Sequence, residues 1–520
     1  MADASSLTPL LRERFGLTSF RKGQAEIIAS ILAGRDTMAI MPTGSGKSLC
    51  YQLPALAQTG LVIVVSPLIS LMNDQVQSLR RLGIPAGCIH SGQEDAQKRE
   101  VFAEIGSGGP FILFLSPERV QKAGFIRWVR PRPVTLFAID EAHCISQWGH
   151  DFRPDYAALD LLRAERPDVP MMLLTATATP HVISDISSRV RLRDPEIHVH
   201  GFYRPNLYIQ VAECAHEVEK MAVLQQALRD KPPGRAIIYC GTRKGCEEVA
   251  GALSQDFNDV DFYHAGLPPG ERERVQGDYN RGTISTLVAT NAFGMGIDHP
   301  DVRLVAHYQV PANLESYYQE MGRAGRDGKD ATCLLLYARK DKGLQSFFIR
   351  ESVAPPEIIK HRWTALDTMI HYAEGGGCRH GGILTYFRDS NPIASCGHCD
   401  TCDPKSLRAV RKDAPAIQAA RAQGRPRRAR GPRGEPPKPS LLADPLALRR
   451  METLRDWRKT FAKDNEMPAF LVFSDKTLRA LADRNPASRS DLLAVYGIGE
   501  QKADFFGSDV LKVLRELEKE

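Results

Sequence analysis

The chain has 520 residues, more than one hydrophobic core usually accommodates, so we expect three or four domains. It has no apolar run of about 18 residues, and segment 1–14 lacks the charged-then-apolar layout of a signal peptide. These features argue against a membrane protein and predict a cytoplasmic one, where the eleven cysteines are not expected to form a disulfide framework.

The net charge of +6 is unevenly distributed along the chain. Residues 405–440 contain 11 of the 68 Lys and Arg residues but only 2 of the 62 Asp and Glu residues, so the remainder is slightly acidic. A local cationic segment of this kind points to nucleic acid as a partner and says nothing about the rest of the chain.

Short apolar runs alternate with helical stretches through the first two hundred residues, which predicts a doubly wound parallel sheet. The runs lie at 37–41, 61–66, 111–116, 135–140 and 171–175. The first leads into the phosphate loop, Pro42–Ser48, a glycine-rich turn whose backbone N–H groups can surround a triphosphate. The nucleotide-binding residues expected here are Thr43, Gly44, Ser45, Gly46, Lys47 and Ser48.

Within this loop, Lys47 can reach the β- and γ-phosphates and Ser48 can ligate Mg²⁺. Met41 replaces the opening glycine of the strict pattern, so the loop alone also fits an ordinary strand-to-helix turn. The run Ile-Asp-Glu-Ala-His at 139–143 disfavours that alternative, because Asp140 can hold the same ion and Glu141 can polarise the attacking water. The pair of motifs predicts an enzyme that hydrolyses a nucleoside triphosphate.

A second set of apolar runs, at 236–240, 261–264, 283–290, 304–308 and 331–337, follows a break at 201–214 and predicts a second lobe with a cleft between the two. Within this second half, a helix around 316–321 ends at Gly322. Arg323 and Arg326 follow at a spacing that can aim both side chains into the cleft, where they would stabilise charge on the γ-phosphoryl group. The alternative is a solvated salt-bridge cluster on the surface.

Four cysteines, Cys378, Cys396, Cys399 and Cys402, have spacings that can close a tetrahedral, structural Zn²⁺ site. An iron–sulfur cluster can use a similar run, but the fourth cysteine and the proline expected downstream are absent. His380 and His398 are alternative ligands.

The segment 405–440 is rich in Arg, Pro, Ala and Gly, cannot bury a core and is predicted to be a disordered linker. The cluster at 425–433 either binds phosphates without reading sequence or is an inert solvated linker. The last segment has helical periodicity through Leu448, Met451, Leu454, Trp457 and Phe461. Its later turn at 497–499, followed by Lys502, could present backbone N–H groups to a phosphate.

Several motifs together resemble those of superfamily-two helicases. They are the phosphate loop, Ser-Pro-Leu-Ile-Ser-Leu-Met at 66–72, Asp-Glu-Ala-His, Thr-Ala-Thr at 175–177, Ala-Phe-Gly-Met-Gly-Ile-Asp at 292–298 and the segment 319–327. Directly after Asp-Glu-Ala-His, Cys-Ile-Ser-Gln-Trp-Gly-His-Asp-Phe-Arg-Pro at 144–154 is similar to the aromatic-rich loop of RecQ DNA helicases. The resemblance covers residues 10–404 and roughly the last 75, and the final segment resembles an HRDC domain.

The resemblance implies an α/β fold with two RecA-like lobes, each a doubly wound parallel sheet. The expected parts are a first ATP-binding lobe at 1–205, a second lobe at 206–345, a zinc-binding subdomain at 346–404, the basic linker at 405–440 and an HRDC-like helical bundle at 441–520. The winged-helix domain that typical bacterial relatives place after the zinc site is expected to be absent.

The resemblance also implies roles for individual residues. The expected catalytic set is Lys47, Asp140, Glu141, Gln319, Arg323 and Arg326, with Gly294 and Asp298 also at the nucleotide. Arg21 and Gln24 are expected at the adenine, although Leu17 replaces the usual aromatic residue and Gln24 could instead be a solvated helix residue. The expected DNA-binding residues are Gln147, Trp148, His150, Phe152 and Arg153, with packing between the lobes as the alternative for Trp148 and Phe152.

The function implied is an ATP-, Mg²⁺- and Zn²⁺-dependent DNA helicase that moves 3′ to 5′ on single-stranded, forked or duplex DNA in recombination and repair. A single-strand DNA-binding protein or a topoisomerase is the implied protein partner, and the implied location is the nucleoid if the source is bacterial. Three alternatives stay open: a translocase or annealing factor without unwinding, an RNA helicase, and a nucleic-acid-binding scaffold without ATPase activity.

Overall fold

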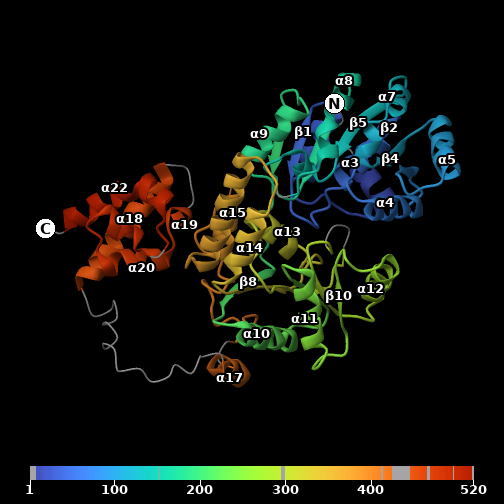
Figure 1. Cartoon of the computed structure of the whole chain (residues 1–520). Coiled ribbons are helices and arrows are strands. Elements are labelled where there is room, and N and C mark those ends of the chain that lie inside the picture. The colour runs from blue at the N-terminus through green and yellow to red at the C-terminus, as the bar shows by residue number, and fades with distance from the viewer. Residues whose placement is uncertain are drawn as a thin grey trace.

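The computed structural model describes residues 7–149, 151–293, 299–389, 391–411, 414–423, 445–464, 469–495 and 497–517. Figure 1 shows two lobes, blue to green and green to yellow, with the orange helix α15 (Pro356–Glu374) beside the second lobe and a red helical bundle at the C-terminus. Within these ranges, no helix combines the length and the hydropathy needed to cross a bilayer.

The first lobe is a seven-stranded, wholly parallel sheet with strand order β3-β4-β2-β5-β6-β1-β7. Apolar side chains alternate between its two faces and are covered on both by helices, so the core forms two layers. The strands are β1 (Thr37–Ile40), β2 (Leu61–Val65), β3 (Ala86–Ile89), β4 (Phe111–Leu115), β5 (Val134–Ile139), β6 (Met171–Thr175) and β7 (Glu196–Val199).

Nine α-helices and two 3₁₀ helices are described in this lobe. They are α1 (Thr8–Phe15), α2 (Gln24–Leu32), α3 (Leu49–Ala57), α4 (Ile69–Arg81), α5 (Asp95–Gly106), α6 (Pro117–Val120), α7 (Ala123–Val129), η2 (Ala142–Ile145), η3 (Pro154–Ala158), α8 (Asp160–Glu165) and α9 (Pro180–Arg189).

The second lobe is a six-stranded parallel sheet with strand order β10-β11-β9-β12-β13-β8. Its strands are β8 (Leu207–Glu213), β9 (Arg235–Tyr239), β10 (Val260–Tyr263), β11 (Thr286–Ala289), β12 (Val302–His307) and β13 (Ala331–Tyr337). Its helices are α10 (Glu217–Asp230), α11 (Arg243–Leu253), α12 (Pro269–Arg281), α13 (Leu314–Met321) and α14 (Asp341–Arg350). The prediction of two doubly wound lobes is confirmed.

The predicted break at 201–214 is wrong over half of its length, because residues 207–213 form strand β8. This strand pairs with β13 on one side. On the other side it meets the cysteine-rich segment, where Ile209 forms a bridge with Cys399 and Ile209 O accepts a hydrogen bond from Asp400 N (3.0 Å). The zinc-binding subdomain, with α15 (Pro356–Glu374) and α16 (Arg379–Tyr386), is therefore joined to the second lobe along a sheet edge.

The prediction that 405–440 lacks structure is wrong for its first part. Gln210 of β8 exchanges two hydrogen bonds with the backbone of Val410 (2.8 and 3.0 Å). Helix α17 (Pro415–Gln423) then packs on α10, and Ile417 and Ala420 are buried there. These few apolar residues could not be recognised from the composition of 405–440, because most of the residues in that segment are polar. The arginine cluster at 425–433 lies outside the described residues.

The C-terminal bundle consists of α18 (Pro445–Asp464), α19 (Ala469–Val472), α20 (Asp475–Arg484), α21 (Arg489–Leu493) and α22 (Glu500–Leu517). Leu454, Phe473, Leu481 and Phe506 form its core, and Trp457 packs beside Phe473. The predicted helical bundle is confirmed. Between Asp403 and Pro445, the described residues contain α17 and no strand, so no winged-helix fold is seen in that part.

Candidate functional site

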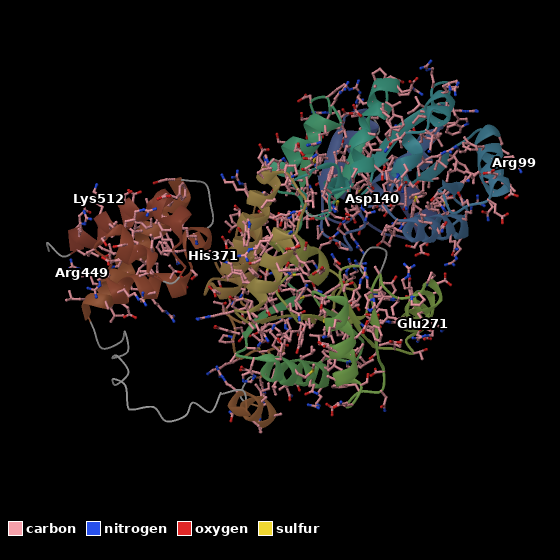
Figure 2. The ribbon with its side chains drawn as sticks, viewed as in Figure 1. Arg99, Asp140, Glu271, His371, Arg449 and Lys512 are labelled. Carbon is pink, nitrogen blue, oxygen red and sulfur yellow. The ribbon has the colours of Figure 1, made fainter. Side chains whose placement is uncertain are left out.

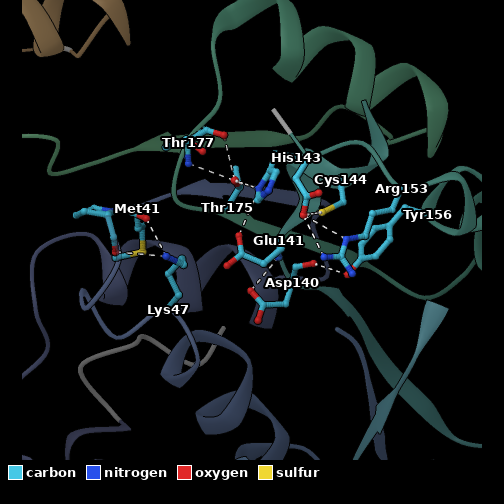
Figure 3. A network of polar contacts seen from close by, with 12 residues as sticks. Met41, Lys47, Asp140, Glu141, His143, Cys144, Arg153, Tyr156, Thr175 and Thr177 are labelled. Atoms are coloured by element: carbon cyan, nitrogen blue, oxygen red, sulfur yellow. Dashed lines mark hydrogen bonds and ion pairs between the residues drawn. The ribbon is translucent and has the colours of Figure 1, made fainter. Parts of the chain in front are cut away.

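The predicted nucleotide site lies at the carboxyl edge of three neighbouring strands. Strand β6 pairs with β1 and with β5, all parallel, so the phosphate loop after β1, Asp140 after β5 and Thr175 at the end of β6 converge. Figure 3 shows Lys47, Asp140, Glu141 and Thr175 gathered at this edge. Open parallel sheets bind their ligands outside the carboxyl ends of the strands, and these residues gather at that edge.

The phosphate loop has the backbone that a triphosphate requires. Gly44 and Gly46 adopt left-handed φ values of +81° and +82°, which residues other than glycine rarely adopt. Lys47 Nζ donates hydrogen bonds to the carbonyls of Met41 (3.0 Å) and Pro42 (3.3 Å). Burial lowers the pKa of Lys47, while the neighbouring Glu141 and Asp140 act to raise it. The ammonium group is thus held inside the loop, opposite two carboxyl groups.

Asp140 and Glu141 form a close acidic pair. Asp140 Oδ1 accepts a hydrogen bond from Glu141 N (3.0 Å), and Glu141 has a left-handed φ of +49°, a strained conformation for a non-glycine residue. Burial, followed by the charge of Glu141, raises the pKa of Asp140 to about 7. Ser48 precedes α3 and Asp140 follows β5, so a hydroxyl and a carboxylate, the hard oxygen donors that Mg²⁺ prefers, fit that ion.

A polar network joins this pair to strand β6. His143 Nδ1 lies 3.3 Å from Glu141 Oε2 and 3.0 Å from Thr175 Oγ1. Thr175 Oγ1 in turn accepts a hydrogen bond from Thr177 N (3.2 Å), and Tyr156 OH donates to Asp140 O (3.1 Å) (Figure 3). The Thr-Ala-Thr motif is recognisable in the sequence, but the roles of His143 and Tyr156 are not, because their partners depend on the fold.

The expected adenine-binding residues contact the phosphate loop. Gln24 is only 2% exposed, so the alternative of a solvated helix residue is wrong. Its Nε2 donates to Ser45 O (3.2 Å) and Gly46 O (3.0 Å), and its Oε1 accepts from Arg21 N (2.8 Å). Arg21 Nη1 also donates to Gly44 O. These two residues therefore hold the loop in its present conformation.

The second lobe places Arg326 against the phosphate loop. A Cβ atom on Gly44 would lie 3.2 Å from Arg326 Cγ, and one on Gly322 would lie 3.7 Å from Thr43 Cβ, so the two lobes touch here. Arg323 is 5% exposed and lies beside Tyr239 of β9. The alternative of a solvated surface cluster is therefore wrong.

The structure shows one of three further expected site residues. Gln319 is half-buried on α13, one turn before Arg323. Gly294 and Asp298 lie outside the described residues.

The aromatic-rich loop, 144–154, lies between the first lobe and α15. The Trp148 ring meets those of His181 on α9 (5.0 Å) and His361 on α15 (5.4 Å), both edge-on, and His361 hydrogen-bonds to the Trp148 backbone. Arg153 Nη1 donates to Pro67 O (3.2 Å) and its Nε to Asp151 (3.2 Å). The alternative for Trp148 was packing between the lobes. The structure shows that part of the Trp148 ring is packed in this way, between α9 and α15.

A cavity of about 710 Å³ opens between the lobes next to this loop. Gln147, Trp148 and Phe152 line it from the first lobe, and Gln309, Asn313 and Phe348 are among the residues that line it from the second lobe and α14. Gln147 is exposed, and His150 lies outside the described residues. The cavity brings aromatic and amide side chains of both lobes together.

Four cysteine sulfurs, of Cys378, Cys396, Cys399 and Cys402, lie within 4.8 Å of one another. A tetrahedral zinc site with bonds of about 2.3 Å would bring them to about 3.8 Å, so a small contraction suffices. The hydrogen bond between Cys378 and Cys399 lowers the pKa of Cys399 and raises that of Cys378, so Cys399 is the first of the pair to become the thiolate that zinc needs. His380, Cys396 and His398 form a second close group, but His380 Nε2 already contacts Leu207 O (3.0 Å).

The C-terminal bundle contacts α15 through Lys502, whose Nζ hydrogen-bonds to His371 Nε2. Figure 2 shows His371 on the side of the molecule that faces the bundle. Burial lowers the pKa of Lys502 to about 8 and that of His371 to about 4. The turn at 497–499 was expected to present backbone N–H groups to a phosphate, and Lys502, which follows it, contacts α15.

Family models match most of the chain. The model described as DEAD/DEAH box helicase matches residues 21–186, and that described as helicase conserved C-terminal domain matches 219–328. Models described as RecQ zinc-binding and HRDC domain match 339–403 and 447–514.

Individual proteins are similar over long alignments. An ATP-dependent DNA helicase RecQ of Haemophilus influenzae is 42% identical over 398 residues, which cover 76% of this chain and 63% of that protein, less than two thirds of its length. A RecQ helicase of Bacillus subtilis is 34% identical over an alignment that covers 96% of each chain. The structure of S. cerevisiae Dbp5 bound to RNA and ADP BeF3 matches with a TM-score of 0.52 over 69% of this chain and 97% of that one; at 18% identity this shows the fold alone.

Proposed function

Because the chain belongs to the RecQ family of helicases, we propose that it is an ATP-dependent DNA helicase that moves 3′ to 5′ along one strand and unwinds duplexes in recombination and repair. One observation carries the proposal furthest: Arg326 of the second lobe lies against Gly44 of the phosphate loop in the first. A nucleotide bound at this loop therefore contacts both lobes, and its hydrolysis can change their separation.

The proposed chemistry assigns each polar group one task. Lys47 and the N–H groups of the phosphate loop bind the β- and γ-phosphates, while Ser48 and Asp140 hold Mg²⁺. The ion, when bound, neutralises phosphate charge. Glu141 orients the attacking water and accepts its proton, and Arg323 and Arg326 stabilise the charge that develops on the transferred group. Gln24 and Arg21 exchange their contacts with the loop for contacts with the base.

The proposed DNA path runs through the cavity between the lobes. Trp148 and Phe152 line it, and the same loop is tied to the catalytic pair, because Tyr156 just beyond it donates to Asp140 O. A base that displaces the Trp148 ring from His361 would shift this loop and, through Tyr156 and His143, the carboxylates. DNA binding and hydrolysis are thereby coupled. Zinc would serve to hold the cysteine segment against β8, and a single-strand DNA-binding protein or a topoisomerase is proposed as partner from family membership alone.

A second candidate is a translocase or annealing factor that hydrolyses ATP on single strands without separating duplexes. The observation that favours it is the lack of a winged-helix fold among the residues described between Asp403 and Pro445. An RNA helicase is less well supported, because the likeness to RNA-bound Dbp5 concerns the fold alone.

ATP hydrolysis, measured with no nucleic acid, with single-stranded DNA and with RNA, tests the proposal. DNA should stimulate turnover more than RNA does. Lys47→Ala and Arg326→Ala should each lower stimulated turnover by on the order of a hundredfold or more, since each removes a charge from the transition state. The matched control is Arg281→Ala on α12, whose side chain is 68% exposed and pairs with Asp278. Stronger stimulation by RNA, or full turnover in Arg326→Ala, would refute the proposal.

A further inference from the structure

Two adjacent phenylalanines near the end of α14 have side chains in solvent. Phe347 is 56% exposed and Phe348 is 43% exposed, and their ring centroids lie 6.0 Å apart, edge to face. Val353, in the segment that leads to α15, is fully exposed. We call these three residues the aromatic rim. Large apolar side chains gathered in water mark a contact surface rather than a core.

The aromatic rim borders the cavity that holds the proposed DNA path. Phe348 and Val353 line the same 710 Å³ space as Trp148 and Phe152. Arg362 of α15 also lines it and donates a hydrogen bond to Ser352 Oγ, which places a guanidinium beside the rim. An apolar surface flanked by a cation, and continuous with an aromatic-rich loop, fits a polyanion that carries planar bases.

We propose that the aromatic rim is a second base-stacking surface for the single DNA strand, on the opposite side of the cavity from the aromatic-rich loop. This inference rests on the proposed function, since it needs a strand in the cavity. Every base has a flat face that stacks on an aromatic ring whatever the sequence, while a nearby guanidinium pairs with backbone phosphate. The rim thus binds bases without selecting among them.

The two aromatic sets belong to different parts of the motor. Trp148 and Phe152 follow β5 in the first lobe, whereas Phe348 lies on α14, directly after the last strand of the second lobe. When the lobes separate, the distance between the two sets changes, so bases can stay stacked on one set while they leave the other. Such alternation is what stepwise movement along a strand requires.

The test measures the affinity of the full chain for fluorescein-labelled oligothymidylate by anisotropy, without nucleotide. Phe348→Ala should weaken binding about tenfold, which corresponds to about 1.4 kcal/mol, and Phe347→Ala/Phe348→Ala should weaken it further. Phe348→Tyr, which keeps the ring, should bind within about twofold of wild type. The matched control is Leu407→Ala, since Leu407 is an apolar residue that is 95% exposed and lies outside this cavity.

A second oligonucleotide with the same backbone but with abasic sites separates stacking from phosphate contact. The wild-type protein should bind this abasic oligonucleotide more weakly than oligothymidylate. The double variant should bind the two oligonucleotides with similar affinity, because it has already lost the stacking contacts. If wild type binds oligothymidylate and the phenylalanine variants match Leu407→Ala, the inference is wrong and the proposed function stands. If the variants lose equal affinity for both oligonucleotides, the rim contacts the backbone and stacking is refuted. If wild type binds no single strand, the proposed function itself fails.

Discussion

At the residue scale, the charges of the nucleotide site depend on one another. Burial and the charge of Glu141 raise the pKa of Asp140 to about 7, while burial lowers the pKa of Lys47. His143 holds Glu141 in place from the side of Thr175. A divalent cation would favour the ionised carboxylates, so the ion and the acidic pair stabilise each other.

This coupling predicts a pH-dependent stability effect of Asp140. Its folded-state pKa lies above the ordinary value of 3.8, so the protein without nucleotide or Mg²⁺ loses stability as pH rises toward and through about 7. Asp140→Asn removes that loss. The variant should therefore gain about 2 kcal/mol relative to wild type between pH 5.5 and pH 8, measured by thermal unfolding at both values. A difference between the two proteins that is the same at both pH values would contradict the assigned burial.

Residues that meet through a shared strand edge could be predicted from sequence, whereas residues that meet through tertiary packing could not. The phosphate loop and Asp140 each follow a strand of one parallel sheet, and their motifs specify them locally. The burial of Gln24 under the phosphate loop and the contact of Trp148 with His361 depend on where distant helices pack. Sequence patterns contain no signal for such contacts, so they left two alternatives open for each residue.

At the element scale, strand β8 and the cysteine segment support each other. Arg379 donates to Asp400 (2.8 Å), and Asp400 Oδ2 accepts from Val211 N of β8 (2.9 Å), so the zinc loop completes the edge of the second sheet. The strand was missed because it lies between two lobes predicted from longer apolar runs and has polar residues, such as Gln210, whose partners lie about 200 positions away. Helix α17 was missed for a different reason, because its buried residues, Ile417 and Ala420, lie among many polar neighbours.

Loss of zinc should therefore loosen β8. Cys399→Ser should be purified with little zinc, and the amides of 207–213 should exchange hydrogen at least tenfold faster than in wild type, because the bridge to Ile209 and the contact from Asp400 are weakened. Cys88→Ser, a free buried thiol on strand β3, is the matched control and should keep both zinc and protection. Full zinc content in Cys399→Ser would remove this residue from the ligand set.

At the scale of the whole molecule, the C-terminal bundle is docked on α15 through a half-buried, basic contact. Lys502 meets His371, and the charges of Asp367, Lys342 and Glu374 act on Lys502 as well. Burial dominates, because the pKa of both members of the contact is lowered. Docking therefore disfavours protons on either side chain.

Docking should become stronger as pH rises. The pKa of Lys502 falls from 10.5 to about 8 on burial, so the docked state binds fewer protons above pH 8, and His371 gives the same sign below pH 6.5. Energy transfer between dyes on the bundle and on the second lobe should report more docked molecules at pH 9.5 than at pH 7. Lys502→Met, which cannot take up a proton, should remove the rise above pH 8. An identical pH response in Lys502→Met and wild type would show that another group controls docking.

In the proposed function, the two lobes act as an ATP-driven motor that separates the strands of a DNA duplex. The decisive measurement is ATP-dependent unwinding of a forked duplex with a 3′ single-stranded tail, beside a 5′-tailed control and the Lys47→Ala variant, with hydrolysis recorded in parallel. The account predicts that the wild-type protein separates the 3′-tailed fork and leaves the 5′-tailed duplex paired. The Lys47→Ala variant should separate neither substrate. DNA-stimulated hydrolysis without strand separation would contradict it and identify a translocase instead.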